Sequence, residues 1–402
     1  MKRLLMLGGS AAQVNAIKHA KKLGLHVILC DYLTDNPGQH FADEYIPAST
    51  TDEKAILQIA EKKKIDGIVA YASDPAAPTA AFVGNKLGLP SNPYESVVTL
   101  CRKDLFRDFL RKNGFQTPRM ASFPFNAQEE AFDFFNSLKS EAIIKPVDSS
   151  GSKGISIIKD TESFYIKFEH ATTFSRCKKI IIEELIESKC DKVLEPECFL
   201  RDGNLAFSCY LNSHRDHSCG PLVPTGPSFP SIFSKEIIDA SSQTIISILK
   251  LLKMNMGALN IEFIVDKRDN PWLIEIGPRN GGNLLPELIL SITGVDMIDV
   301  TIKSALGMNC IINSNTTNNT FIATHVIHSR KAGFLKGLSF SHWLEERIFY
   351  RLFYKKPGDP VERFEGANQA IGIIMMRFSS EDEMHETLDT IYERHINLGV
   401  EN

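Results

Sequence analysis

Two stretches near position 270 decide the fold: residues 260–263 read NIEF, and residues 272–282 read WLIEIGPRNGG. Glu262 and Glu275 each lie inside an apolar run that is typical of a β-strand. A carboxylate in such a run is costly to bury unless it is paired or binds a metal ion. The spacing suits two neighbouring strands of a hairpin, with both carboxylates facing one cation. Such oxygen ligands predict Mg²⁺ over nucleotide phosphates, with Mn²⁺ as the alternative ion.

The bulk composition is that of a globular protein with several domains. Of 402 residues, 43% are hydrophobic and 23% are charged, and this length predicts roughly two to four domains. The formal net charge of −4 offers no basic surface, so we expect no nucleic acid and no membrane as partner. Apolar runs of about eight residues are too short to span a membrane. The eight cysteines form no Cys-x-x-Cys pairs, which favours a reduced, cytoplasmic protein.

Residues 1–95 alternate strand and helix patterns, which predicts a parallel sheet in a Rossmann-like domain. The opening MKRL looks like the start of a signal peptide, but the apolar run ends at Gly8, so a strand fits better. The turn Gly8-Gly9-Ser10 lacks the full G-x-G-x-x-G pattern. A tight turn is therefore favoured over a dinucleotide site, and a nicotinamide-dependent oxidoreductase is the weaker rival.

The rest of the chain divides where the pattern changes. Residues 96–112 predict one charged linking helix, and residues 113–310 predict an α+β unit. The polar run 313–319 (NSNTTNN) predicts a linker. Residues 320–402 show strand patterns and a final predicted helix from about 380 to 397, which indicates a small C-terminal α+β domain.

A loop of small residues follows a buried strand that ends in Lys145. Residues 147–154 read VDSSGSKG and join the strand at 142–146 to a strand at 155–158. Small residues leave backbone N–H groups free to bind phosphate oxygens, and Lys145 would add a fixed charge. No helix follows the glycines, so this is not a Walker A loop. A flexible hairpin with an extended lysine is the equal alternative.

A second apolar strand, residues 180–187 (IIIEELIE), ends in acids beside an apolar pair. Backbone groups at Glu184 and Ile186 would suit an adenine edge, and Glu187 or Glu195 would suit ribose hydroxyls. For this segment alone, an ordinary strand end is the favoured alternative.

The order of these elements resembles the ATP-grasp superfamily over about residues 1–310. The elements that carry the resemblance are Lys103, Lys145 with its loop, the acidic hinge, and then Glu262, Glu275 and Arg279. The resemblance implies two α+β subdomains that hold ATP between them, with a hinge near 183–187. It implies that phosphates contact Lys103, Lys145 and the loop residues Ser150, Gly151, Ser152 and Gly154. It implies adenine contacts from Glu183, Glu184, Leu185 and Ile186, a ribose contact from Glu195, and Mg²⁺ at Glu262 and Glu275. The implied catalytic residues are Arg279, on the reacting carboxylate, and Lys145.

Residues 275–282 (EIGPRNGG) look like the subgroup of amino-acid ligases and related carboxylate–amine ligases. This resemblance implies an enzyme that activates a carboxylate as an acyl phosphate, forms ADP and joins the acyl group to an amine. Small-molecule acid and amine substrates, and a homodimer, are the expected partners. The alternatives are a carboxylase or carboxylate–thiol ligase of the same fold, or a non-catalytic nucleotide-binding protein.

The sequence departs from the family pattern at two places. Gly277 stands where the family often has an Asn that is a further metal ligand, so either Asn280 or water would have to replace it. The unusual insert at 188–191 (SKCD) leaves the ribose contact open between Glu187 and Glu195.

Several polar residues outside these motifs have open roles. Asp74 is either a helix N-cap before Pro75 or a ligand contact at the sheet edge. His325 and His328 are expected on opposite faces of a strand or near a bulge, with at most one facing the core or a site, and neither has an assigned role. A zinc site is the weaker interpretation of Cys209, His214, His217 and Cys219. We instead expect residues 214–231 to form a loop over the active site, with substrate contacts from His214, Arg215 and Ser228.

Overall fold

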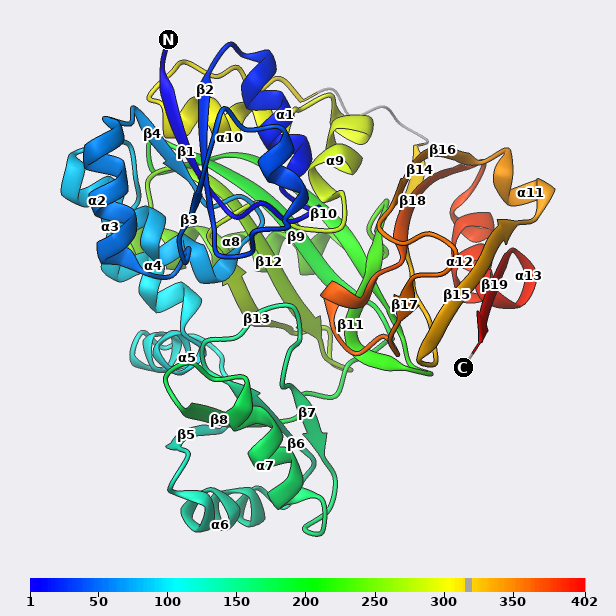
Figure 1. Cartoon of the computed structure of the whole chain (residues 1–402). Helices are drawn as coiled ribbons and strands as arrows, with labels where there is room; N and C mark the ends of the chain where they lie inside the picture. The colour runs from blue at the N-terminus through cyan, green and yellow to red at the C-terminus, as the bar shows by residue number, and fades with distance from the viewer. Residues whose placement is uncertain (315–319, 402) are drawn as a thin grey trace.

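Figure 1 shows the computed structural model of the chain, which describes residues 1–314 and 320–401. Most of the predicted linker at 313–319 lies outside the described residues. One parallel sheet lies near the N-terminus, and the named strands of the other sheets in the described residues pair antiparallel, as predicted for an α/β and α+β chain. No helix among the described residues is long and apolar enough to cross a membrane.

The N-terminal sheet is parallel, with the strand order β3-β2-β1-β4. Leu4 and Met6 pack against α1 and α10, whereas Leu5 and Leu7 pack against α2 and α3. Residues 4–7 of β1 are therefore all apolar, because helices cover both faces of the sheet. The elements of this region are β1 (Arg3–Leu7), α1 (Val14–Lys22), β2 (His26–Asp31), η1 (Pro37–His40), β3 (Glu44–Pro47), α2 (Glu53–Lys63), β4 (Gly67–Val69), η2 (Asp74–Ala76), α3 (Ala77–Leu87) and, from later in the chain, α10 (Met297–Ala305).

The linking segment is two helices, α4 (Tyr94–Cys101) and α5 (Lys103–Lys112), so the prediction of one helix over 96–112 was wrong. Arg102 between them has extended backbone angles, φ −110° and ψ 108°. The backbone N–H of Lys103 donates to the carbonyl of Val147 instead of continuing the first helix. This contact comes from a segment distant in sequence, so local helix propensity could not predict the break.

A small four-stranded sheet, at the bottom of Figure 1, carries the predicted phosphate loop. Its strand order is β5-β8-β6-β7, and all its pairings are antiparallel. The loop at 147–155 connects β6 to β7, as expected from the sequence. The elements are β5 (Met120–Pro124), α6 (Gln128–Leu138), β6 (Ala142–Pro146), β7 (Ser156–Ile158), α7 (Phe164–Thr173) and β8 (Lys179–Glu184).

An eight-stranded sheet runs through the rest of the molecule in the order β13-β12-β9-β10-β11-β14-β18-β16. Strand β11 pairs with β14, so three strands of the C-terminal segment extend the sheet that begins at residue 193. The division of the chain into separate domains stays a prediction. The elements are β9 (Val193–Arg201), β10 (Asn204–Asp216), β11 (Gly220–Phe229), α8 (Lys235–Leu251), β12 (Gly257–Val265), β13 (Pro271–Gly277), α9 (Leu285–Thr293), β14 (Phe321–Ile327), β16 (Ile348–Phe353) and β18 (Gly372–Phe378).

The C-terminal residues end in a strand, not in the helix predicted from 380 to 397. The helical segments are α12 (Glu381–Asp389) and α13 (Ile391–Arg394), and β19 (Ile396–Glu401) then pairs with β15 (Gly333–Phe340). The partner strand lies about sixty residues earlier in the chain, so it left no local signal in the sequence. The remaining elements are α11 (His342–Glu345), β17 (Pro360–Val361) and η3 (Ala367–Gln369).

Candidate active site

Glu262 and Glu275 lie directly opposite each other on β12 and β13. These strands form an antiparallel hairpin, as the sequence predicted, with an irregularity in register just after Glu262. Directly opposite residues project to the same face of a sheet, with Cβ atoms about 4.5–5.5 Å apart. The hairpin therefore brings two carboxylates to one face.

The surroundings of Glu262 disfavour its ionised form. Burial raises the pKa of Glu262 to about 7; Arg215 opposes this shift and the charge of Glu275 adds to it. The guanidinium of Arg215 lies 3.4 Å from Glu262 Oε1. Two carboxylates opposite each other, one of which burial disfavours in its ionised form, fit the ligand chemistry of Mg²⁺.

Arg279 joins the carboxylate hairpin to the N-terminal sheet. Its guanidinium donates to both carboxylate oxygens of Asp74, at 2.7 and 2.8 Å, and to Asn260 Oδ1 at 2.8 Å. Burial alone would lower the pKa of Arg279, but the charge and hydrogen bonds of Asp74 hold it above the usual value. The N-cap of η2 is Ser73, so the interpretation of Asp74 as a helix cap was wrong.

The Asp74–Arg279 pair also explains why residue 277 is glycine. A Cβ at Gly277 would lie 2.7 Å from Asp74 Oδ1 and 3.0 Å from Arg279 Cζ, which is too close for any side chain. Asn280 does not replace the missing ligand, because its fully buried amide faces α10. There it donates to the Met297 carbonyl at 3.4 Å and accepts from Thr301 Oγ1 at 3.1 Å.

Lys145 and Glu183 form a buried ion pair with a third residue, Arg107. Glu183 is 2% exposed and accepts from Lys145 Nζ and from Arg107 Nε, both at 2.6 Å. Burial would raise the pKa of Glu183, but Arg107 and Lys145 lower it to about 2. The sequence placed Glu183 among the adenine contacts; its side chain instead holds two cations. Arg107 was missed, since an arginine beside Phe106 in a charged helix looks solvent-exposed.

The hinge residues begin at the end of β8 and continue beyond it. The backbone N–H groups of Glu184 and Leu185 donate to the carbonyls of Arg119 and Glu141, and Ile186 comes after them. Glu195 lies elsewhere, on β9, where it is 6% exposed and accepts from Asn260 Nδ2 at 3.0 Å. The other ribose candidate, Glu187, lies at the surface in a pair with Lys267. Of the two candidates for the ribose contact, Glu195 is therefore the residue that lies beside the carboxylate hairpin.

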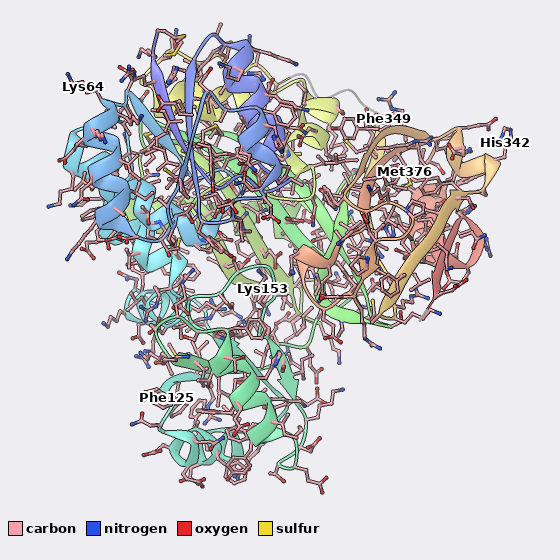
Figure 2. The ribbon with its side chains drawn as sticks, in the orientation of Figure 1. Lys64, Phe125, Lys153, His342, Phe349 and Met376 are labelled. Carbon is pink, nitrogen blue, oxygen red and sulfur yellow. The ribbon has the colours of Figure 1, made fainter. Side chains whose placement is uncertain are left out.

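The loop at 147–155 holds a conformation that few residues other than glycine adopt. Gly151, Ser152 and Gly154 all have positive φ, from 60° to 73°. Lys103 Nζ donates to the carbonyl of Ser149 at 2.7 Å, and Ser152 Oγ donates to the carbonyl of Leu222 on β11 at 2.8 Å. Figure 2 labels Lys153, between the small sheet and the large one. These contacts place Lys103 and the loop, with Ser150, where the two sheets approach each other.

Residues 214–229 are not the loop expected from their Pro and Gly content. They form most of the β10–β11 hairpin, with irregular register around Arg215. His214 Nε2 lies 2.8 Å from Ser228 Oγ, and Arg215 reaches Glu262 as described. Pro and Gly mark turns, but here they occupy an irregular part of a wide sheet.

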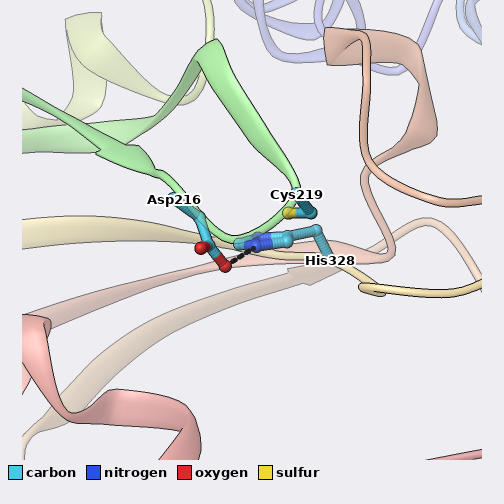
Figure 3. A group of neighbouring side chains, drawn as sticks. All are labelled: Asp216, Cys219 and His328. Atoms are coloured by element: carbon cyan, nitrogen blue, oxygen red, sulfur yellow. Dashed lines mark hydrogen bonds and ion pairs between the residues drawn. The ribbon is translucent and has the colours of Figure 1, made fainter.

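The four predicted zinc candidates do not come together as a set. Among the described residues, the group with metal-ligand spacing is Asp216, Cys219 and His328, whose ligand atoms lie within 4.8 Å of one another (Figure 3). Asp216 Oδ2 is already held by His328 Nε2 at 3.0 Å and by Arg330 Nε at 2.9 Å. Arg330 therefore already supplies a positive charge to Asp216.

Comparison with known proteins agrees with this geometry. Residues 102–311, more than half of the chain, match the model of the family "Carbamoyl-phosphate synthase L chain, ATP binding domain". A formate-dependent phosphoribosylglycinamide formyltransferase of Prochlorococcus marinus is 28% identical over 318 residues, 76% of this chain and 77% of that protein.

Solved structures share the fold over the whole chain. An L-amino acid ligase from Bacillus licheniformis has a TM-score of 0.82 at 18% identity, covering 100% of this chain and 99% of its own. A phosphoribosylglycinamide synthetase from Anaerococcus prevotii has a TM-score of 0.75 at 24% identity, with both chains fully covered. The chain therefore belongs to the carbamoyl-phosphate synthase L chain ATP-binding family, within the ATP-grasp superfamily.

Proposed function

We propose that the protein is an ADP-forming carboxylate–amine ligase and that Glu262, Glu275 and Arg279 form its reaction centre. The observation that carries the proposal is the β12–β13 register. It sets two half-buried carboxylates opposite each other, with Gly277 two positions after Glu275 and Arg279 two positions further along the chain. Glu262 and Glu275 would hold Mg²⁺. When bound, that ion supplies positive charge to the ATP phosphates and to the phosphoryl group in transfer.

The reaction has two steps. A carboxylate oxygen of the acid attacks the γ-phosphorus of ATP, the bond to the β-phosphate oxygen breaks, and ADP leaves. The amine nitrogen then attacks the acyl carbon, inorganic phosphate departs with the electrons of the C–O bond, and the nitrogen loses a proton. Arg279 would orient the acid and stabilise the oxyanion of the second step, since Asp74 holds its guanidinium in place.

Lys145 would contact the ATP phosphates together with Lys103 and the backbone N–H groups at Ser150, Gly151, Ser152 and Gly154. Lys145 is 6% exposed and bound to Glu183, so it would turn toward the phosphates only if Glu183 kept another cation. Arg107 is that cation, because it donates to the same carboxylate at 2.6 Å. The adenine would lie against Glu184, Leu185 and Ile186, and the ribose would contact Glu195.

The alternatives make different predictions about products. A carboxylase or carboxylate–thiol ligase would release ADP without consuming an amine, and a non-catalytic nucleotide-binding protein would release none. We also propose that the protein is cytoplasmic, because its eight cysteines are all free, which suits a reducing compartment. We propose further that it is a homodimer, which sedimentation would measure.

The test is a product assay with purified protein, ATP, Mg²⁺ and a matrix of small carboxylic acids and amines. We expect ADP and phosphate in a 1:1 ratio for at least one acid–amine pair, with an amide as the third product. AMP and pyrophosphate as products would reject the acyl-phosphate route. ADP formation that is the same with and without every amine would favour the carboxylase or thiol-ligase alternative.

A further inference from the structure

A cavity of about 270 Å³ lies between the β10–β11 hairpin, β14 and the helices α12 and α13. Arg215 connects it to the carboxylate hairpin, because this residue lines the cavity and its guanidinium lies 3.4 Å from Glu262 Oε1. The roles proposed above for ATP, Mg²⁺ and the acid involve none of the residues in the cavity wall. The space is large enough for several water molecules, and so for a short aliphatic molecule.

Two buried side chains in the wall each have a polar atom without a hydrogen-bond partner among the described residues. These atoms are His325 Nε2 and Thr324 Oγ1, on residues that are 6% and 1% exposed. Burial lowers the pKa of His325 well below its usual value, so its imidazole is neutral. With its proton on Nδ1, the neutral ring presents Nε2 as an acceptor for an ammonium group. A ligand that donates here would satisfy an atom that is otherwise costly to bury.

His328 lines the same cavity, so the expectation that at most one of the two histidines faces the core or a site was wrong. His328 lies one residue beyond the end of β14, so the alternation of a strand does not set its direction relative to His325. Its ring is fully buried against Phe364, at 4.4 Å between centroids, and lies 3.0 Å from Asp216 Oδ2. The protein therefore already holds the His328 ring, whereas His325 Nε2 is available to a ligand.

The charges of the wall favour a cationic ligand. Four carboxylates and two guanidinium groups line the cavity, at Asp191, Asp216, Asp389, Glu393, Arg215 and Arg330. Arg330 lies 2.9 Å from Asp216 and 3.5 Å from Glu393, so one cation serves two acids. The charge of Arg215 is directed at Glu262, and Asp191 is paired with Lys192. Asp389 forms no ion pair with any residue that the structure describes, so it is open to a cation.

The two signs of charge lie at different depths in the wall. The side chain of Arg215 is 7% exposed, whereas Asp389 and Glu393 are exposed. A positive charge disfavours a second one nearby, so an amine beside Arg215 is held in its neutral, nucleophilic form. An ammonium group suits the exposed acids. A ligand with an amine at each end meets both requirements.

We propose that the amine substrate is a diamine without a carboxylate, and that this cavity binds it. One amine lies beside Arg215 and faces the reaction centre, and the other, as an ammonium group, contacts His325 and Asp389. The inference rests on the proposed carboxylate–amine ligase reaction and adds the class of its amine. In the second step the neutral nitrogen forms a bond to the acyl carbon and the bond from that carbon to the phosphate oxygen breaks. The phosphate leaves with the electron pair and takes the proton from the nitrogen, and the amide product keeps the second ammonium group.

The experiment compares amines of similar length that differ at the far end. Putrescine and cadaverine carry a second ammonium group, butylamine and pentylamine carry a methyl group, and γ-aminobutyrate and δ-aminovalerate carry a carboxylate. With the acid found in the product assay, we expect kcat/KM for the better diamine to exceed that for its monoamine about tenfold or more. The two carboxylate-bearing amines should be no better than the monoamines. A monoamine or a carboxylate-bearing amine that equals the diamine would overturn the proposal.

Two variants locate the contact. Asp389→Asn should lower the diamine-to-monoamine ratio of kcat/KM about fivefold, as expected for one exposed ion pair. The control is Asp382→Asn, an exposed aspartate on the same helix that does not line the cavity and should leave the ratio unchanged. His325→Leu should lower the ratio about tenfold without lowering the melting temperature, since it replaces a buried nitrogen that has no partner. An unchanged ratio in both Asp389→Asn and His325→Leu would overturn the proposal.

Hydroxylamine distinguishes a failure of this inference from a failure of the ligase proposal, because it traps an acyl phosphate as a hydroxamate. Hydroxamate formation without any diamine product would overturn the inference and leave the ligase proposal standing. If the protein forms neither ADP nor hydroxamate with any acid, the ligase proposal fails. Calorimetry with putrescine and cadaverine then tests the cavity: binding that Asp389→Asn weakens supports a diamine site, and no binding overturns it.

Discussion

Asp74 and Arg279 form a two-point ion pair across 205 positions of sequence, with N–O distances of 2.7 and 2.8 Å. The pair joins the loop after β4 in the N-terminal sheet to the loop after β13. It also occupies the space that a side chain at position 277 would need. The position of the guanidinium is thus set by the N-terminal region, and Gly277 is a consequence of this arrangement.

Asp74→Asn should lower kcat/KM for the acid while leaving ATP binding close to normal. The variant removes the charge that orients Arg279. Loss of one charged hydrogen-bonding partner corresponds to a decrease in kcat/KM of about 10- to 100-fold. Steady-state kinetics with varied acid and a separate ATP titration would measure both quantities. The exposed Asp35→Asn is the control, and an equal decrease in that variant would argue against a specific role.

Glu183→Gln should destabilise the protein by about 3–5 kcal/mol, since it leaves Lys145 and Arg107 buried without a counter-charge. Glu184→Gln, one residue further and partly exposed, is the matched control and should change the unfolding free energy by less than about 0.5 kcal/mol. Urea unfolding monitored by fluorescence would measure both.

The effect of Glu183 should also depend on pH in a defined direction. Its folded-state pKa is about 2, below the usual 4.5, so its stabilisation is complete above pH 4.5 and is lost as pH falls toward 2. The difference between wild type and Glu183→Gln should therefore narrow in acid. A constant difference from pH 7 to pH 3 would contradict the ion-pair account.

The sequence was informative where one residue type has few physical explanations. Two acids in apolar strands predicted the hairpin, and the strand–helix alternation predicted the parallel sheet. The sequence was uninformative where a residue's interaction partner lies far away in the chain. Nothing near Asp74 indicates Arg279, and nothing near Arg107 indicates Glu183. The Pro- and Gly-rich residues 214–231 predicted a loop, whereas the pairing of β10 with β11, and of β11 with β14, makes most of them strands.

Gly154→Ala should weaken ATP binding by about tenfold or more. Gly154 has φ 73°, and a Cβ there would lie 2.8 Å from Phe174 Cβ and Pro146 Cγ, so the loop would have to move. Gly337→Ala is the control, because it has open space and no positive φ. Titration with a non-hydrolysable ATP analogue would measure the affinities. Equal affinity in the two variants would show that the loop does not bind the phosphates.

Relative to the wild type, Glu197→Gln should be more stable at high pH than at low pH. Glu197 is fully buried, its Oε1 accepts from the Gly281 N–H, and burial raises its pKa to about 8. A raised carboxyl pKa means that the native state keeps a proton that the unfolded state loses, so wild-type stability decreases as pH rises from 4.5 toward 8. The melting temperature of Glu197→Gln minus that of the wild type should rise between pH 5 and pH 9. A difference independent of pH would show that Glu197 is ionised in the fold.

The central claim is that Glu262 and Glu275 hold the Mg²⁺ that the reaction needs, and Glu275→Gln tests it most directly. We expect ADP release by Glu275→Gln to fall at least about 100-fold while its melting temperature stays that of the wild type. The surface control Glu61→Gln should keep wild-type activity. Normal ADP formation by folded Glu275→Gln would contradict the account.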